Sequence, residues 1–175
     1  MNRPEEHEFA PHFAGYIALV PEDHILPVLV DQVNEVRFLA AAIPPERETY
    51  RYAPGKWTIR EIIGHVTDGE RVFGHRAFCI ARGEQASLPS FDEQAYMAES
   101  NYCDRPLAEL VEEFAALRGV NLAFLRSLPP EAWKRRGTAN GVSVTVTALA
   151  YILAGHARHH LVVLRDRYGA PAVPA

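Results

Sequence analysis

The chain has 175 residues, 48% of them hydrophobic and 23% charged, which predicts one ordinary globular domain over residues 1–175. Its net charge of −4 argues against nucleic acid as a partner, because proteins that bind the phosphate backbone are usually basic. The polar N-terminus and the absence of an apolar run of about 20 residues predict a soluble, cytoplasmic protein with no membrane partner.

The first two predicted helices cover residues 23–43 and 58–82. In both segments apolar residues recur three and four positions apart, which is typical of an amphipathic helix with one buried face. Thr58 and Glu61 fit a capping box, in which each side chain binds a free backbone N–H group at the start of a helix. We therefore expect the second helix to begin at Thr58.

The last two predicted helices cover residues 106–128 and 145–168. Pro129 follows the third helix and Gly169 follows the fourth, and both residue types are typical of helix ends. The β-branched segment 142–147 has two interpretations. We favour an early start of the fourth helix there, and a short strand is the alternative.

The longest link between the helices covers residues 83–105, with a possible short helix at 92–100. Helices joined by so long a link need not run antiparallel to each other, and some helix bundles contain such crossover connections. The sequence therefore predicts an all-α fold, a four-helix bundle with a long crossover between its second and third helices.

Three histidines stand on the predicted buried faces. In the fourth helix His156 and His160 occupy positions where apolar residues are expected, and their spacing of four places both rings on one face. His65 lies close to the apolar stripe of the second helix. Burying an imidazole without a partner costs about 1–3 kcal/mol, so we expect either a shared metal ion or a set of hydrogen bonds within the core.

Two segments resemble the DinB/YfiT-like superfamily. The stretch 56–71, KWTIREIIGHVTDGER, is similar to the second-helix signature of that family, and 148–160, ALAYILAGHARHH, is similar to its last-helix signature. The stretch from Phe78 to Asp92 also resembles small family members. The resemblance covers about residues 16–168.

This resemblance implies an up-down-down-up four-helix bundle, often a homodimer. It implies that His65, His156 and His160 bind one divalent metal ion, with zinc or nickel the first candidates. Some family members are transferases or isomerases that use a low-molecular-weight thiol with a small-molecule substrate.

Three imidazoles leave an open coordination position, which is typical of catalytic rather than structural metal sites. A metal there would deprotonate a bound thiol, so a metal-dependent thiol transferase is the preferred interpretation. A metal-dependent hydrolase and a non-catalytic metal-binding protein of stress response remain the alternatives.

Further residues near these positions could support the site. The candidates that could hold the ligand histidines from a second layer are Asp68, Glu70, Tyr151 and His159. For Arg71 and Arg76 we expect salt bridges to an acidic residue on a neighbouring helix, and binding of a substrate carboxylate is the alternative.

Overall fold

A computed structural model describes residues 3–171 of the chain. Four long helices dominate it: α2 (Ile25–Ala41), α3 (Ile59–Ala81), α5 (Leu107–Arg126) and α7 (Val146–Tyr168). Their ends lie within two residues of the expected bounds. The capping box of Thr58 and Glu61 is present at the start of α3, as the sequence predicts.

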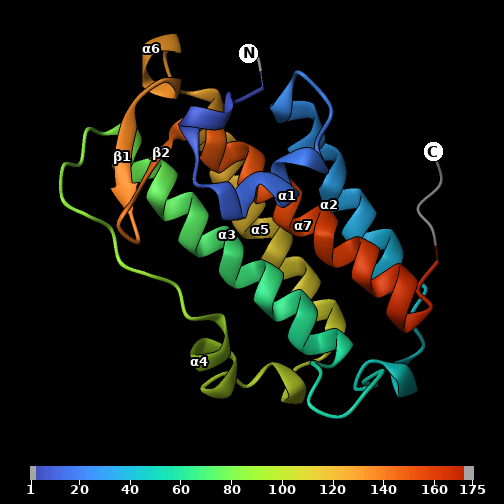
Figure 1. Ribbon diagram of the computed structural model, residues 1–175. Coiled ribbons are helices and arrows are strands. Elements are labelled where there is room, and N and C mark those ends of the chain that lie inside the picture. Colours follow the sequence, from blue (N-terminus) through green and yellow to red (C-terminus); the bar gives the residue numbers. More distant parts are fainter. Residues whose placement is uncertain (1–2, 172–175) are drawn as a thin grey trace.

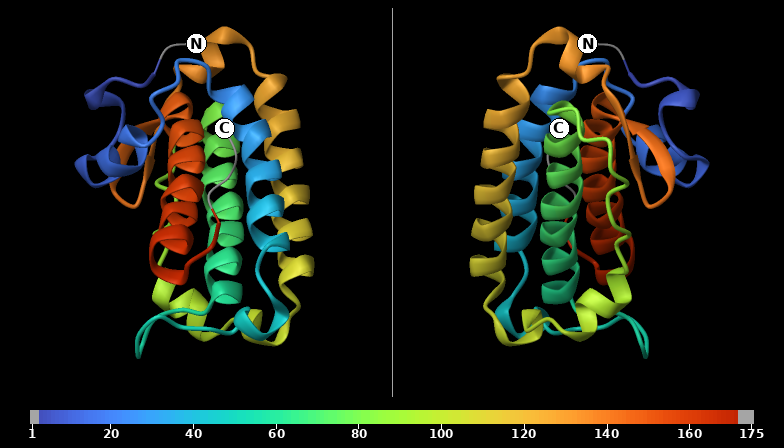
Figure 2. Two further views of the ribbon diagram at one scale, coloured as in Figure 1. Left: turned by 90° about the vertical axis from the view of Figure 1, so that its right-hand side faces the viewer. Right: turned by 90° about the vertical axis from the view of Figure 1, so that its left-hand side faces the viewer.

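The four helices form the bundle shown in Figures 1 and 2, and the all-α fold is confirmed. α2 and α7 run in one direction and α3 and α5 in the other, which is an up-down-down-up arrangement (Figure 1). α3 packs against α5 and α7, and α2 packs against the same two helices. The link after α3 passes back along the outside of the bundle, through the short helix α4 (Glu93–Ala98) and a turn at Tyr102–Asp104, before α5 begins.

The N-terminal segment folds over one face of the bundle. Two 3₁₀ turns, Glu6–Glu8 and Pro11–Phe13, lead into α1 (Ala14–Ala18), which packs against α7. The approach is close at Gly155, where an added β-carbon would lie 2.1 Å from the carbonyl oxygen of Tyr16. Glycine at this position therefore lets the N-terminal segment reach α7.

The expected early start of the fourth helix is wrong, and the short strand is correct. β2 (Val142–Thr145) pairs antiparallel with β1 (Arg136–Ala139), and α7 begins only at Val146. Two features set this boundary. The side chain of Thr145 accepts a hydrogen bond from the backbone N–H of Ala148, which makes Thr145 the helix cap. The hairpin turn at Asn140 and Gly141 has positive φ at both residues, as a tight two-residue turn requires.

The remaining elements close the ends of the bundle. They are the 3₁₀ turn Pro45–Arg47 and the short helix α6 (Pro130–Trp133), which precedes the hairpin. Within residues 3–171 no helix is both long and apolar enough to cross a membrane.

A buried polar network ties the four helices together. The guanidinium of Arg118 on α5 donates to both carboxylate oxygens of Glu70 on α3, at 3.0 and 2.7 Å. It also donates to the side-chain oxygen of Gln32 on α2 at 2.8 Å, and the Gln32 amide donates to the carbonyl of Ala154 on α7. This network fixes the helices relative to one another close to His156, because Ala154 lies two residues before it.

Candidate metal centre

The structure brings three predicted histidines to one point inside the bundle. His65 comes from α3, and His156 and His160 come from adjacent turns of α7. The Nε2 atoms of His65 and His156 lie 2.9 Å apart, and the three ring centroids are 4.7–4.8 Å from one another. One nitrogen from each ring falls within a common span of 4.8 Å, close enough for a shared metal ion.

The burial of these rings poses a bonding problem. His65 and His156 are only 2% and 4% exposed, and Nε2 of His160 is buried with no hydrogen-bond partner among the described residues. A tetrahedral ion with metal–nitrogen bonds of about 2.0–2.1 Å would separate its ligand nitrogens by about 3.3 Å. The 2.9 Å separation is near this value, and an ion would satisfy the free Nε2 of His160. The donor set therefore fits a divalent metal ion.

Aromatic rings and a glycine hold the cluster in place. The ring of Trp57 lies 4.8 Å from that of His65, and Tyr16 and Phe73 lie 5.5 and 5.6 Å from that of His156. The backbone of Gly69 fits against the His156 ring and leaves no room for a side chain. The space that Gly69 leaves on α3 is thus filled by the His156 ring.

The surroundings keep the three imidazoles neutral. Burial lowers the pKa of His65 to about 4, and the nearby His159 adds a smaller effect in the same direction. Burial also lowers the pKa of His156 and of His160 well below the ordinary value, and the neighbouring histidines add to this. Neutral imidazole is the form that binds metal ions, so the cluster is ready to bind one near neutral pH.

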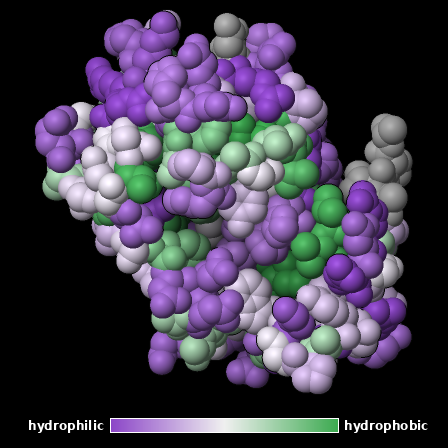
Figure 3. Space-filling view, in the orientation of Figure 1, coloured by the Kyte–Doolittle hydropathy of each residue, from purple (hydrophilic) through white to green (hydrophobic). Residues whose placement is uncertain are grey.

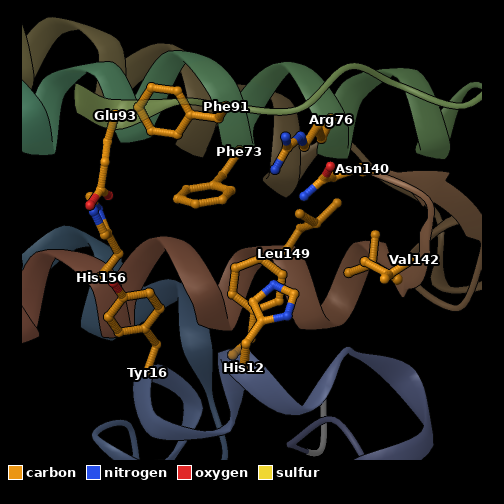
Figure 4. Close-up of a pocket in the computed structure, with 13 residues that line it drawn as sticks. His12, Tyr16, Phe73, Arg76, Phe91, Glu93, Asn140, Val142, Leu149 and His156 are labelled. Atoms are coloured by element: carbon orange, nitrogen blue, oxygen red, sulfur yellow. The ribbon is translucent and has the colours of Figure 1, made fainter. Parts of the chain in front are cut away.

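Glu93, at the start of α4, is an acidic residue beside the cluster. Its carboxylate lies 3.8 Å from Nε2 of His65, and about half of its side chain is exposed. In Figure 4 this side chain points toward the His156 ring from the opposite wall. A carboxylate in this position can act as a further ligand or accept a proton from a group bound beside the histidines.

A cavity of about 230 Å³ opens onto the cluster at His156. Its walls come from α1, α3, α7, the hairpin and the link before α4, as Figure 4 shows. Figure 3 shows a hollow on the face of the molecule that carries α1 and α3. A small molecule could therefore approach the histidines from this side.

The four residues expected to support the ligand histidines have different surroundings. The side chain of Asp68 accepts a hydrogen bond from the hydroxyl of Tyr102 at 2.6 Å, and Glu70 binds Arg118. Tyr151 donates its hydroxyl to the carbonyl of Glu22. These side chains thus have partners away from the cluster.

His159 is the fourth of these candidates, and it does lie beside the cluster. Its ring is 4.9 Å from that of His160 and 5.4 Å from that of Tyr16. It is half-buried on α7.

Arg71 and Arg76 of α3 differ in their partners. Arg71 forms ion pairs with Glu113 of α5 and, at 3.6 Å, with Asp68, in agreement with the expected salt bridge. For Arg76 the expected salt bridge is wrong, since no carboxylate pairs with it within the described residues. Its side chain turns into the cavity instead, because it follows Phe73 on the face of α3 that lines this space.

Sequence reasoning missed Tyr16 and Glu93 as parts of the site. Tyr16 comes from the N-terminal segment, whose position over α7 has no signal in helical periodicity. Glu93 stands in the expected short helix at 92–100, but an acidic residue at a helix start is common for other reasons. In the sequence, a glycine at position 155 inside the predicted fourth helix could have indicated such packing.

The fold and the site together define a four-helix bundle that carries a largely buried three-histidine cluster beside a cavity. A family model described as the DinB superfamily matches residues 29–164. The chain belongs to this superfamily, as the resemblance of its two histidine-bearing segments indicated. The comparison with curated proteins gave no match.

Solved structures share the fold. YfiT from Bacillus subtilis, described as a probable metal-dependent hydrolase with an unusual four-helix bundle topology, has a TM-score of 0.75 and 18% identity, with 97% of this chain and 94% of that one covered. A DinB-like protein of the same organism, YjoA, has a TM-score of 0.60 and 21% identity over 86% of this chain and 95% of that one.

A mycothiol-dependent maleylpyruvate isomerase has a TM-score of 0.63 and 19% identity. The match covers 85% of this chain and 61% of the isomerase, so the isomerase has a substantial part with no counterpart here. At these identities the three likenesses show the fold alone.

Proposed function

We propose that this protein is a metal-dependent enzyme that holds one zinc or nickel ion through His65, His156 and His160. The observation that carries the proposal is the meeting of three neutral imidazoles at one point, those of His65 and His156 buried and that of His160 partly buried. The Nε2 atom of His160 is itself buried and has no partner among the described residues. Imidazole ligands suit both metals, so the ligand set does not select between them. The aromatic rings of Trp57, Tyr16 and Phe73 pack beside the rings of His65 and His156.

The cavity favours catalysis over passive metal binding. A metal-storage protein can close its site with its own side chains, whereas here a cavity reaches His156. Arg76 and Asn140 line it and can bind an anionic molecule. These contacts support an enzyme that acts on a small molecule rather than a non-catalytic stress-response protein.

The preferred reaction is transfer of a low-molecular-weight thiol to an electrophilic carbon. A divalent ion held by three imidazoles lowers the pKa of a bound thiol or water. Residues of this chain supply the proton acceptor and the walls of the cavity. Glu93 is placed to accept the released proton, and Phe73 and Tyr16 line the cavity beside His156. The mycothiol-dependent isomerase shows that this fold can serve a thiol-dependent reaction.

Hydrolysis is the second candidate. The specific observation in its favour is the carboxylate of Glu93, 3.8 Å from a proposed ligand nitrogen, because a general base beside a metal-activated water is the usual arrangement in metal-dependent hydrolases. The description of YfiT as a probable metal-dependent hydrolase agrees with it.

Elemental analysis of the purified protein tests the metal site. We expect about one zinc or nickel per chain in the wild type and little in His156→Ala. His75→Ala is the matched control, because His75 is exposed on α3 and its ring contacts Cys79 instead of the cluster. Stoichiometric metal in His156→Ala would overturn the ligand assignment.

Two assays on the metal-loaded protein separate the reactions. A thiol transferase should be stabilised against heat by its thiol, and it should consume an electrophile only when the thiol is present. A hydrolase should cleave activated esters without any thiol. If the metal-loaded protein shows neither activity across a panel of thiols and esters, the result would favour the non-catalytic alternative.

The proposal also includes a homodimer, which the family resemblance implies, and a cytoplasmic location, which the sequence predicts. Light scattering after size-exclusion chromatography tests the dimer, and a monomer at micromolar concentration would contradict it.

A further inference from the structure

Arg76 is a buried arginine without an acidic partner. It is 6% exposed, and the other buried arginine in the described chain, Arg118, has its charge matched by Glu70. Arg76 donates one hydrogen bond, from Nη2 to the carbonyl of Pro89 at 2.8 Å. Its Cζ atom lies 5.6 Å from the centre of the Phe73 ring. These contacts hold the guanidinium in place without neutralising it.

A buried, uncompensated charge is costly unless something pairs with it. Burial lowers the pKa of Arg76 from its ordinary value, which is the effect expected when no carboxylate is close. A guanidinium carries five N–H donors, and the contact with Pro89 uses one of them. Donors therefore remain for an anion that enters from the cavity.

The position of Arg76 determines which end of the cavity an anionic group would occupy. Figure 4 shows Arg76 beside Asn140 at one end of the cavity and Glu93 with His156 at the other. The side chains of Phe73 and Leu149 lie between the two ends. The cavity thus has a cationic end, an apolar middle and an end that opens onto the histidine cluster.

We propose that Arg76 is the binding site for the carboxylate group of a small ligand whose apolar body packs between Phe73 and Leu149. The other end of this ligand then faces the histidine cluster. The substrate is thus a compound with a carboxylate on a short apolar chain. The binding of its carboxylate by Arg76 is independent of the proposed function, and only the reaction at its other end rests on that function.

Carboxylate is favoured over phosphate by charge and by size. One guanidinium matches the single negative charge of a carboxylate with a planar pair of hydrogen bonds. Phosphate carries up to two negative charges and usually needs more hydrogen-bond donors from its binding site. The cavity volume of about 230 Å³ is below the roughly 300–1,000 Å³ of most ligand pockets, which favours a small ligand.

Calorimetric titration of the full chain with hexanoate, hexanamide and pentyl phosphate tests the proposal. The amide keeps the apolar chain and removes the charge, and the phosphate replaces one anion with another. We expect hexanoate to bind the wild type about ten-fold or more tightly than hexanamide does. Arg76→Gln should lose this difference, and Arg76→Lys should keep part of it.

Arg82→Gln is the matched control, because Arg82 lies at the end of the same helix, is exposed and does not line the cavity. It should bind hexanoate as the wild type does. The Nε–H signal of Arg76 in NMR spectra of the wild type gives a readout that needs no variant. It should shift with hexanoate and stay in place with hexanamide.

Equal binding of hexanoate and hexanamide, or unchanged binding of hexanoate by folded Arg76→Gln, would overturn the proposal. Tighter binding of pentyl phosphate than hexanoate would replace carboxylate with phosphate as the ligand group. The titrations are repeated on metal-free protein. Binding that persists there supports Arg76 even if the metal-dependent activity fails, and binding that disappears would assign the carboxylate to the metal.

Discussion

Gly69 of α3 lies directly against the imidazole of His156 on α7. A β-carbon at position 69 would be 2.7 Å from both Cε1 and Nδ1 of that ring, closer than atoms in proteins ordinarily approach. The two helices can therefore bring His65 and His156 together only with glycine here. The position of the ring depends on a residue that has no side chain.

Gly69→Ala should weaken metal binding by about 10–100-fold, the range seen when residues that orient metal ligands are changed. The added methyl group displaces the His156 ring from His65. Competition with a coloured chelator measures the affinity. Gly119→Ala is the control, since a β-carbon there meets nothing within 4 Å, and it should stabilise α5 by up to about 1 kcal/mol with unchanged metal affinity. Unchanged affinity in Gly69→Ala would contradict this account.

Arg118→Met should lower the free energy of unfolding by about 3–5 kcal/mol, because it leaves Glu70 buried without its partner. Urea denaturation measures the change. Arg37→Met is the control. Arg37 pairs with Glu112 at the surface, where such pairs contribute at most about 1 kcal/mol. Similar losses in the two variants would show that the buried network does not hold the helices together.

The metal-free protein should lose stability as the pH falls from about 6.5 toward 4. The folded state lowers the pKa of His65 to about 4, whereas the unfolded chain titrates near the ordinary value of about 6.5. Between these values the unfolded chain binds more protons, so its free energy falls relative to the folded state.

Melting temperatures across this pH range test the effect. They should decrease with acidification in the wild type and decrease less in His65→Gln, which has no titrating ring at that position. A flat profile in the wild type would be inconsistent with neutral buried imidazoles.

Glu93→Gln should keep the metal and lower turnover by about 100-fold or more, because it removes the group placed to accept a proton while preserving its size. Metal content and the rate of the metal-loaded protein are measured together. Glu99→Gln is the control, since Glu99 is exposed at the other end of α4. Loss of metal in Glu93→Gln would instead make Glu93 a ligand, and full activity would exclude both roles.

The amino-acid sequence by itself determined the helices and which face of each is buried. Apolar spacing and capping residues act within one or two turns, so the bounds of α3, the end of α7 and the shared face of His156 and His160 follow from local rules. The hairpin before α7 was misread because β-branched residues at a helix start fit both structures, and only pairing with β1 selects the strand.

The tertiary structure alone decided what surrounds the histidines. The register between α3 and α7 depends on the fit of Gly69 and on the network around Arg118, and helical periodicity contains no information on either. The placement of Tyr16, Arg76 and Glu93 around one cavity depends on how the N-terminal segment and the link before α5 pack on the bundle. Contacts between segments far apart in the chain depend on how the whole core packs. The set of residues around the cavity is therefore fixed only in the folded protein.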